Sequence, residues 1–182
     1  MGRRGRLLLA DDEVFFVTTS VVGFARVFVE DTYCDILINN IKHYQQQYGF
    51  IIFGYVIMPS HFHWIVYVQR ERGSISDIMR DIKKYSSWDL MQTLRQNGRT
   101  AFNKLFLKEA LSYDDQSRKF WMKRFDDQVI RNTEMLSSKL NYVHDNPVKA
   151  GLVVNPEDYK YSSARNYILG DHSVLAVDCD WF

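Results

Sequence analysis

The sequence predicts an α+β fold in which a ferredoxin-like, RRM-like antiparallel sheet has its helices packed on one face. Two observations lead to it: extended and helical patterns follow in a defined order, and no linker or internal repeat divides the 182 residues. The order is strand, helix, strand, strand, helix, strand, helix, which is close to a split βαβ arrangement. Since domains commonly contain roughly 100–200 residues, we expect a single domain over residues 1–182, with the other face of the sheet open.

The first part of the chain predicts a strand and a helix. Residues 14–22 are β-branched and aromatic, the composition of a strand. From Asp31 to about Tyr48, apolar residues recur at spacings of three and four, which indicates a helix. Asp31 or Thr32 can cap its start, and Gly49 stops it.

A pair of strands follows the helix. Residues 50–58 are a nearly continuous apolar run, as expected of a strand covered on both faces. Pro59 and Ser60 then suit a tight turn, because proline presets φ. The run HFHWIVYV at 61–68 returns as an alternating strand.

A second helix is predicted at 74–94, with Ser74 as its candidate cap. Its buried stripe consists of residues at helical spacing: Ile75, Ile78, Met79, Ile82 and Tyr85. Residues 95–118 are less regular, and we expect a mobile insertion there. A fourth strand is predicted at 121–131.

The last predicted helix starts at Thr133, an N-cap residue with an acidic residue behind it in the first turn. It should end near Asp145 or Asn146, because the residue before Pro147 is pushed out of helical conformation. The remaining residues are expected to form loops and short turns.

The composition is that of a folded protein without a bulk charge. Hydrophobic residues make up 46%, and 23 Lys+Arg against 22 Asp+Glu give a formal net charge of +1. That balance argues against wrapping duplex DNA or coating an anionic membrane. The two cysteines form no CxxC motif, and no apolar run approaches the ~20 residues of a membrane span. We expect a cytoplasmic protein with no membrane partner.

His61 and His63 are the candidate site residues that spacing alone singles out. Strand alternation places both on the same face, and two imidazoles at i and i+2 can bind one cation. The alternative is that both histidines fill space or form hydrogen bonds, since an H-x-H pattern is common by chance.

A third metal ligand could come from the last helix. Tyr142 and Asn146 are four residues apart and share a helix face. The amide oxygen of Asn146 could bind a metal, with Tyr142 one turn away. Each also has an ordinary alternative: Tyr142 as a packing residue, and Asn146 as a cap before Pro147.

Several ordered segments resemble a known family. They are VIMPSHFHWIVYV (56–68), SDIMRDIKKYSS (76–87), FWMKRFDDQVIRN (120–132), YVHDNPVKAGLV (142–153) and YSSARNY (161–167). Together they resemble the single-tyrosine, IS200-like transposases of the HUH superfamily, most closely the REP-associated tyrosine transposases. The resemblance covers about residues 14–167 and implies the same ferredoxin-like fold.

The resemblance also implies a function: a metal-dependent enzyme that cleaves and rejoins single-stranded DNA near hairpins, as in DNA transposition. His61-Phe62-His63 looks like the HUH metal motif, and Asn146 matches the third ligand. Tyr142 matches the nucleophile, which forms a 5′-phosphotyrosine intermediate. Two alternatives stay open: a catalytically idle hairpin-DNA or RNA-binding module on the same fold, and a phosphodiesterase that uses water.

The expected cofactor is Mg²⁺ or Mn²⁺. Ligand chemistry alone would favour zinc, manganese or nickel for two imidazoles and an amide, whereas the resemblance implies magnesium or manganese. Three positions depart from the family pattern without removing a ligand or the nucleophile: Ser60 and Asp145, where Asn is frequent, and Met122, where Gln is frequent.

The expected partner is single-stranded DNA with a hairpin, in the bacterial cytoplasm at the nucleoid. The basic residues expected to contact it are Arg80, Lys83, Lys84, Lys123, Arg124 and Arg131. The alternative is that these residues only solvate the surface. Both a monomer and a homodimer agree with the sequence.

Overall fold

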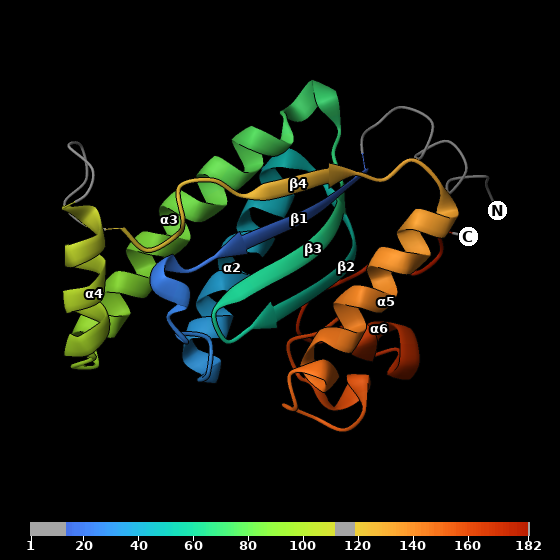
Figure 1. The fold of residues 1–182 in the computed structure, drawn as a ribbon. Helices are drawn as coiled ribbons and strands as arrows, with labels where there is room; N and C mark the ends of the chain where they lie inside the picture. The colour runs from blue at the N-terminus through green and yellow to red at the C-terminus, as the bar shows by residue number, and fades with distance from the viewer. Residues whose placement is uncertain (1–13, 112–118, 182) are drawn as a thin grey trace.

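A four-stranded antiparallel sheet lies at the centre of the protein, in the strand order β2-β3-β1-β4 (Figure 1). The computed structural model describes residues 14–111 and 119–181. The strands are β1 (Val14–Ser20), β2 (Ile51–Met58), β3 (His61–Tyr67) and β4 (Asp126–Val129). This strand order is that of a split βαβ sheet, so the predicted ferredoxin-like fold is confirmed.

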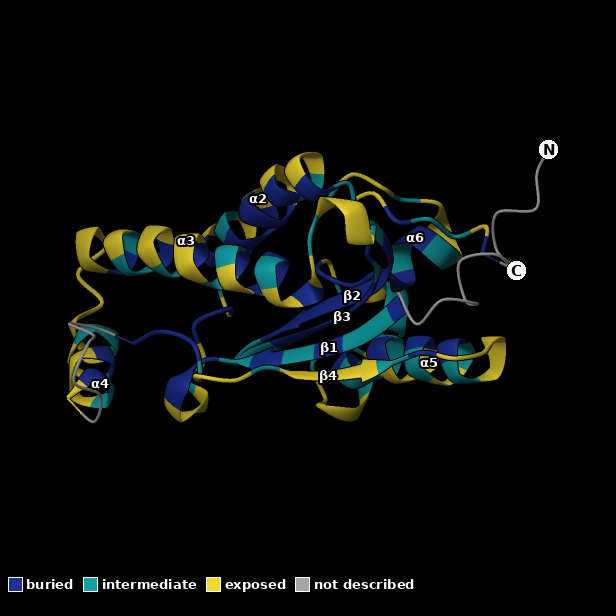
Figure 2. Ribbon diagram, turned by 90° about the horizontal axis from the view of Figure 1, so that it is seen from above, coloured by how far each residue is buried: buried dark blue, intermediate teal, exposed yellow. Residues whose placement is uncertain are grey.

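Helices cover both faces of the sheet, to different extents. Two long helices lie on one face and α5 lies on the other (Figures 1 and 2). The helices are α2 (Asp31–Tyr48), α3 (Ile75–Gln96), α4 (Thr100–Ala110), α5 (Thr133–Lys149) and α6 (Ala164–Leu169). Short 3-10 turns stand at η1 (Val22–Phe24), η2 (Arg70–Arg72) and η3 (Pro156–Asp158). Among the described helices, none has the length and apolar character needed to cross a membrane.

The alternation of β3 divides the core into two layers, as predicted. Phe62 and Trp64 belong to the larger apolar cluster, which also contains residues of α2 and α3. Ile65 belongs to a second cluster on the opposite face, together with Leu136 and Leu140 of α5. The face that the sequence predicts to be open is therefore partly covered, because α5 buries its own apolar stripe there.

Gly54 lets α5 approach the sheet closely. A Cβ atom at this position of β2 would stand 2.6 Å from Cδ1 of Leu140. The absence of a side chain at Gly54 thus makes room for Leu140, and α5 rests directly on β2.

The bounds of α2 agree with the prediction at both ends, but its cap does not. Gly49 ends the helix in the left-handed region, with φ at 65°. The residue at the N-cap is Glu30, without a side-chain cap, whereas Asp31 lies in the first turn and pairs with Lys160. At α3 the predicted cap is confirmed, because Ser74 forms a capping box.

The segment predicted as a mobile insertion at 95–118 contains a helix instead. Helix α4 buries Phe106 and Ala110, and Phe102 packs against the larger core. These apolar residues recur at helical spacing, a signal hidden between polar stretches. The part of the insertion at 112–118 lies outside the described residues.

The fourth strand is shorter than predicted. Ladder pairing is limited to Asp126–Val129, whereas Trp121 forms only an isolated bridge to Val21. Trp121 is buried, and its indole donates a hydrogen bond to Ser86 of α3. The segment before β4 therefore packs against α3 rather than extending the sheet.

Helix α5 begins at Thr133 as expected, with Asn132 rather than Thr133 at the N-cap, and runs past Pro147. The proline lies in the last turn, where the helix loses one backbone hydrogen bond. The amide of Ala150 donates to the carbonyl of Asn146, which closes that turn. The predicted end at Asp145 or Asn146 is wrong by about one turn for this reason, and α6 is a further helix in the region predicted to be loops.

Candidate active site

The two histidines of β3 lie side by side on the sheet face that carries α5. Their ring centroids are 4.8 Å apart, at an interplanar angle of 77°. His63 is only 4% exposed, and His61 is half-buried. The shared face predicted from strand alternation is therefore present in the fold.

Hydrogen bonds orient the two imidazoles. Nδ1 of His63 lies 2.7 Å from Oγ1 of Thr18 on the neighbouring strand β1. Nδ1 of His61 lies 3.2 Å from Oγ of Ser60 in the turn. Nε2 of His63 is buried and has no hydrogen-bond partner among the residues that the structure describes. An unpaired buried nitrogen is costly unless it binds something, so this atom suits a metal ligand.

Burial keeps both imidazoles neutral. Desolvation lowers the pKa of His61. It lowers the pKa of His63 to about 3, with smaller contributions from His61 and Lys139. Neutral imidazole is the form that binds a cation, and the pair is in that form at pH 7.

Tyr142 of α5 lies against this pair. Its ring meets His63 edge-on, with centroids 5.3 Å apart, and meets Phe16 of β1 at 5.9 Å. Phe16 in turn stacks on His63 at 5.5 Å. Tyr142 is 43% exposed, so one edge of its ring is packed while the rest is open to solvent.

Asn146 is half-buried one turn after Tyr142. Its Nδ2 donates a hydrogen bond of 2.7 Å to the backbone carbonyl of Tyr142. This bond leaves the amide oxygen as the available ligand atom, the atom that binds metals. Among the described residues no cluster of three or more His, Cys, Asp and Glu is arranged for a metal. The histidine pair with the amide of Asn146 stays the ligand set that the sequence predicts.

Three neighbours of the site were not among the residues singled out from the sequence. Phe16 and Thr18 share a face of β1, and Thr18 pairs with His63 in the strand register. Lys139 stands one turn before Tyr142, and its Nζ lies 4.6 Å from the Phe16 ring centroid. Period-two alternation in β1 and the i, i+3 spacing in α5 are the signals for them. Strand register brings Thr18 to His63, and the packing of α5 brings Lys139 to Phe16, neither of which local spacing reveals.

The six predicted DNA contacts are distributed over two regions. Arg80 pairs with Asp77 and Asp81 on the exposed side of α3, and Lys84 lies over the rings of Tyr85 and Trp88. The exposed residues Lys123, Arg124 and Arg131 flank β4. Their role in DNA binding stays a prediction.

Lys83 lies between these two regions. It is half-buried, and its Nζ donates hydrogen bonds to the carbonyls of Met122 and Lys123. Burial lowers its pKa to about 8. The contacts of Lys83 connect α3 to the segment before β4.

Comparison with known proteins shows what the chain and its fold are similar to. Residues 25–109 match the family described as Transposase IS200 like. Somewhat less than half of the chain is therefore similar to IS200-like transposases. The matched range contains His61 and His63 and ends before α5, so Tyr142 and Asn146 lie beyond it.

One curated relative and one solved structure extend the likeness. A candidate REP-associated tyrosine transposase of Haemophilus influenzae is 26% identical over 118 residues, which cover 65% of this chain and 61% of the relative. The chain thus matches somewhat less than two thirds of that relative's length. A REP-associated tyrosine transposase bound to a REP hairpin is 22% identical, with a TM-score of 0.64 over 94% of this chain and 89% of that chain. This second match shows that the two share a fold.

Proposed function

We propose that this protein is a tyrosine transposase that cleaves and rejoins single-stranded DNA next to hairpins. The observation that carries the proposal is the contact between Tyr142 and His63 within one chain. It brings a solvent-accessible phenol to two neutral imidazoles. The similarity to a protein that binds a REP hairpin supports a hairpin as the DNA feature recognised.

We propose His61, His63 and Asn146 as the residues that would hold a Mg²⁺ or Mn²⁺ ion. The buried, unpartnered Nε2 of His63 fits this role. If Nδ1–H of His63 donates to Thr18, the lone pair is on Nε2, which is the tautomer a ligand requires. Such an ion, when bound, supplies charge that polarises a phosphodiester.

The residues of this chain orient the nucleophile and the phosphate. Phe16 holds the rings of His63 and Tyr142 in place, and Lys139 puts a positive charge beside them. A phosphate that reaches Tyr142 would therefore also meet the ammonium group of Lys139.

The proposed reaction is a transesterification. Tyr142 gives up its hydroxyl proton to solvent, and its oxygen forms a bond to phosphorus while the bond from phosphorus to the 3′ oxygen breaks. The leaving 3′ oxygen takes up a proton from solvent. The products are a 5′-phosphotyrosine linkage and a strand with a free 3′-hydroxyl. Because the phosphodiester energy is kept in the new bond, the reverse attack by a 3′-hydroxyl rejoins strands without ATP.

A labelled hairpin-bearing single strand tests the proposal. The protein is incubated with it and Mn²⁺, and a covalent protein–DNA band is sought. The band should form with the unmodified protein and with the control variant Tyr67→Phe, and it should be absent with Tyr142→Phe. Cleavage that persists in Tyr142→Phe without an adduct would instead indicate a phosphodiesterase that uses water. Binding without cleavage would indicate a catalytically idle hairpin-binding module.

A further inference from the structure

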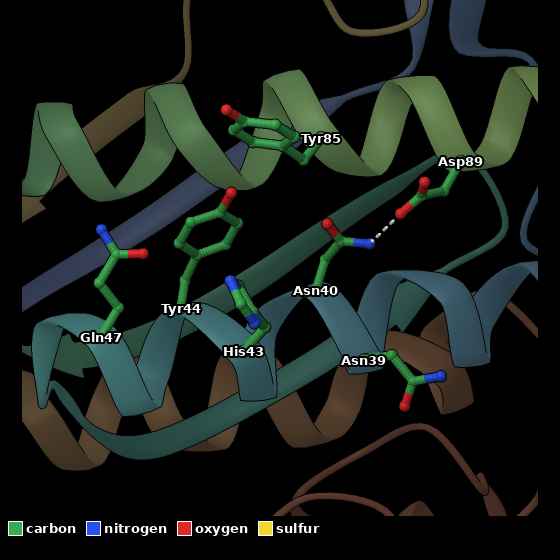
Figure 3. Close-up of a pocket in the computed structure, with 7 residues that line it drawn as sticks. All are labelled: Asn39, Asn40, His43, Tyr44, Gln47, Tyr85 and Asp89. Atoms are coloured by element: carbon green, nitrogen blue, oxygen red, sulfur yellow. Dashed lines mark hydrogen bonds between the residues drawn. The ribbon is translucent and has the colours of Figure 1, made fainter.

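A second potential site lies between α2 and α3, on the opposite face of the sheet from Tyr142. It is an open groove of about 520 Å³, with Asn40 and Tyr44 of α2 on one side and Tyr85 and the exposed Asp89 of α3 on the other (Figure 3). A cavity of this size is in the range of small-molecule sites, which is roughly 300–1,000 Å³. None of its lining residues belongs to the site described above.

The floor of the cavity offers hydrogen-bond acceptors. Asn40 is only 9% exposed, and its Nδ2 donates to the Ile36 carbonyl at 3.0 Å and to Asp89 Oδ2 at 2.9 Å. Both amide hydrogens are therefore used. The amide oxygen points toward α3 beside Tyr85 (Figure 3). The oxygen of Asn40 and the carboxylate of Asp89 together suit a ligand that donates hydrogen bonds, such as an amino group on a ring.

Aromatic rings continue from the cavity along α3. Tyr44 and Tyr85 stand with centroids 5.8 Å apart at an angle of 35°. Trp88 follows within one turn, meets Tyr85 edge-on at 6.0 Å and is 61% exposed. The exposed Trp88 indole therefore extends the aromatic surface of Tyr44 and Tyr85.

A positive charge accompanies the two outer rings. Nζ of Lys84 lies 5.0 Å from the Tyr85 centroid and 5.9 Å from the Trp88 centroid. Single-stranded nucleic acid is bound by this combination, in which aromatic rings stack on bases and cations pair with phosphates.

We infer that the groove between α2 and α3 binds unpaired bases of a DNA strand. A base with an exocyclic amino group enters the cavity and donates to Asp89 and Asn40, the next base stacks on Trp88, and Lys84 pairs with the phosphate between them. Carboxylates accept hydrogen bonds from the N4 amino group of cytosine, so cytosine is preferred over thymine, which has no amino group. This inference rests on the proposed function in one respect: a protein that acts on single-stranded DNA encounters unpaired bases.

The fluorescence of Trp88 can report binding in the groove. The other three tryptophans, Trp64, Trp121 and Trp181, are 0%, 5% and 3% exposed. Stacking of a base should therefore quench the fluorescence of Trp88 selectively. The probes are hairpin-free oligodeoxycytidylate and oligothymidylate of about ten nucleotides, the length of a typical single-strand site, together with dCMP.

Oligodeoxycytidylate should quench the fluorescence, bind about tenfold more tightly than oligothymidylate and bind more tightly than dCMP, which reaches only the cavity. Asp89→Asn keeps the shape of the side chain and should remove the preference for cytosine. Trp88→Ala should weaken binding of the oligonucleotide about tenfold, as measured with a label on the oligonucleotide. Binding of dCMP should be retained. Equal binding of both oligonucleotides, or a preference that Asp89→Asn leaves intact, would overturn the inference.

The test also separates this groove from the catalytic proposal. Tyr142→Phe should lose the covalent adduct and keep the quenching of Trp88, whereas Asp89→Asn should keep the adduct on a short hairpin substrate. If Trp88 fluorescence changes with protein concentration and not with DNA, the groove is an interface between copies of the chain, and the inference is wrong even where the adduct forms.

Discussion

The ring of Tyr142 stands edge-on against the imidazole of His63, with an interplanar angle of 72°. The two residues come from α5 and β3, elements that meet otherwise through aliphatic side chains such as Leu140 and Ile65. The position of the candidate nucleophile therefore depends on how His63 is held and on how closely α5 rests on the sheet. Both dependences can be tested.

Thr18→Val should weaken Mn²⁺ binding and DNA cleavage without unfolding the protein. The substitution keeps the shape of the side chain and removes the hydroxyl at 2.7 Å from Nδ1 of His63. Loss of such a supporting hydrogen bond commonly costs about 10–100-fold in metal affinity or activity. Calorimetric titration with Mn²⁺ and the adduct assay measure the two effects.

Thr19→Val is the matched control. Thr19 is 1% exposed, and its hydroxyl has no hydrogen-bond partner among the described residues. Replacing it should leave Mn²⁺ affinity unchanged and should not lower stability, because a buried hydroxyl without a partner is unfavourable. Equal Mn²⁺ affinities for the two valine variants would show that Thr18 does not orient the ligand.

Lys139→Met should slow formation of the covalent adduct by about tenfold, the effect of losing about 1.4 kcal/mol of transition-state stabilisation. The reason is the loss of a positive charge beside Phe16 and Tyr142. Lys139→Arg should retain most of the rate. The matched control is Lys149→Met, which removes an exposed lysine that pairs with Asp145 later in the same helix. A rate for Lys139→Met equal to that of Lys149→Met would exclude a role for this charge.

Gly54→Ala should destabilise the protein by about 1–3 kcal/mol, as overpacking of a core commonly does. The new methyl group would meet Leu140 at 2.6 Å. Leu140→Ala alone also destabilises, because it leaves a cavity. The double variant should lose less than the sum of the two single losses, since the shortened side chain makes room for the methyl group. Urea unfolding of all four proteins provides the comparison, and additive losses would contradict the proposed contact.

Asp171 should contribute to stability at neutral pH and lose that contribution in acid. Hydrogen bonds from Ser173, and then the guanidinium of Arg165, lower its pKa from 3.8 to about 2. Because the pKa in the folded protein is below that in the unfolded chain, the contribution is complete above about pH 4 and falls as the pH approaches 2. Asp171→Asn should therefore differ from the unmodified protein at pH 6 and approach it near pH 2, as measured by urea unfolding. A difference that does not change over this range would rule out the ionised carboxylate as the cause.

Local sequence patterns correctly predicted the features that depend on residues close together in the chain. The alternation of β3 placed His61 and His63 on one face, and Gly49 ended α2 where a left-handed residue is needed. The segment before β4 was harder to predict. Trp121 is a residue type common in strands, but here its side chain packs on α3 and it forms only an isolated bridge. Pro147 was misleading because a proline near a helix end removes one hydrogen bond and does not by itself stop the helix.

The candidate site was predictable only within each element. Spacing singled out the histidine pair, and together with the family resemblance it singled out Tyr142 and Asn146; the catalytic and metal-binding roles of these residues stay predictions. The supporting residues Thr18 and Lys139 reach the site through strand register and through the packing of α5, which no local pattern encodes. The partial cover of the predicted open face has the same origin, since it depends on where α5 docks.

The connection between β4 and α5 has a consequence for kinetics. Only residues 130–132 join the two elements, and Ile130 is fully buried with its amide bonded to the Val14 carbonyl. So short and anchored a connection holds α5 against the sheet of its own chain, where the Tyr142 ring contacts His63 of the same molecule. We therefore expect an active site that is complete within one molecule. The initial rate of strand cleavage at saturating DNA should then increase in direct proportion to protein concentration, with no lag and no second-order regime at low concentration.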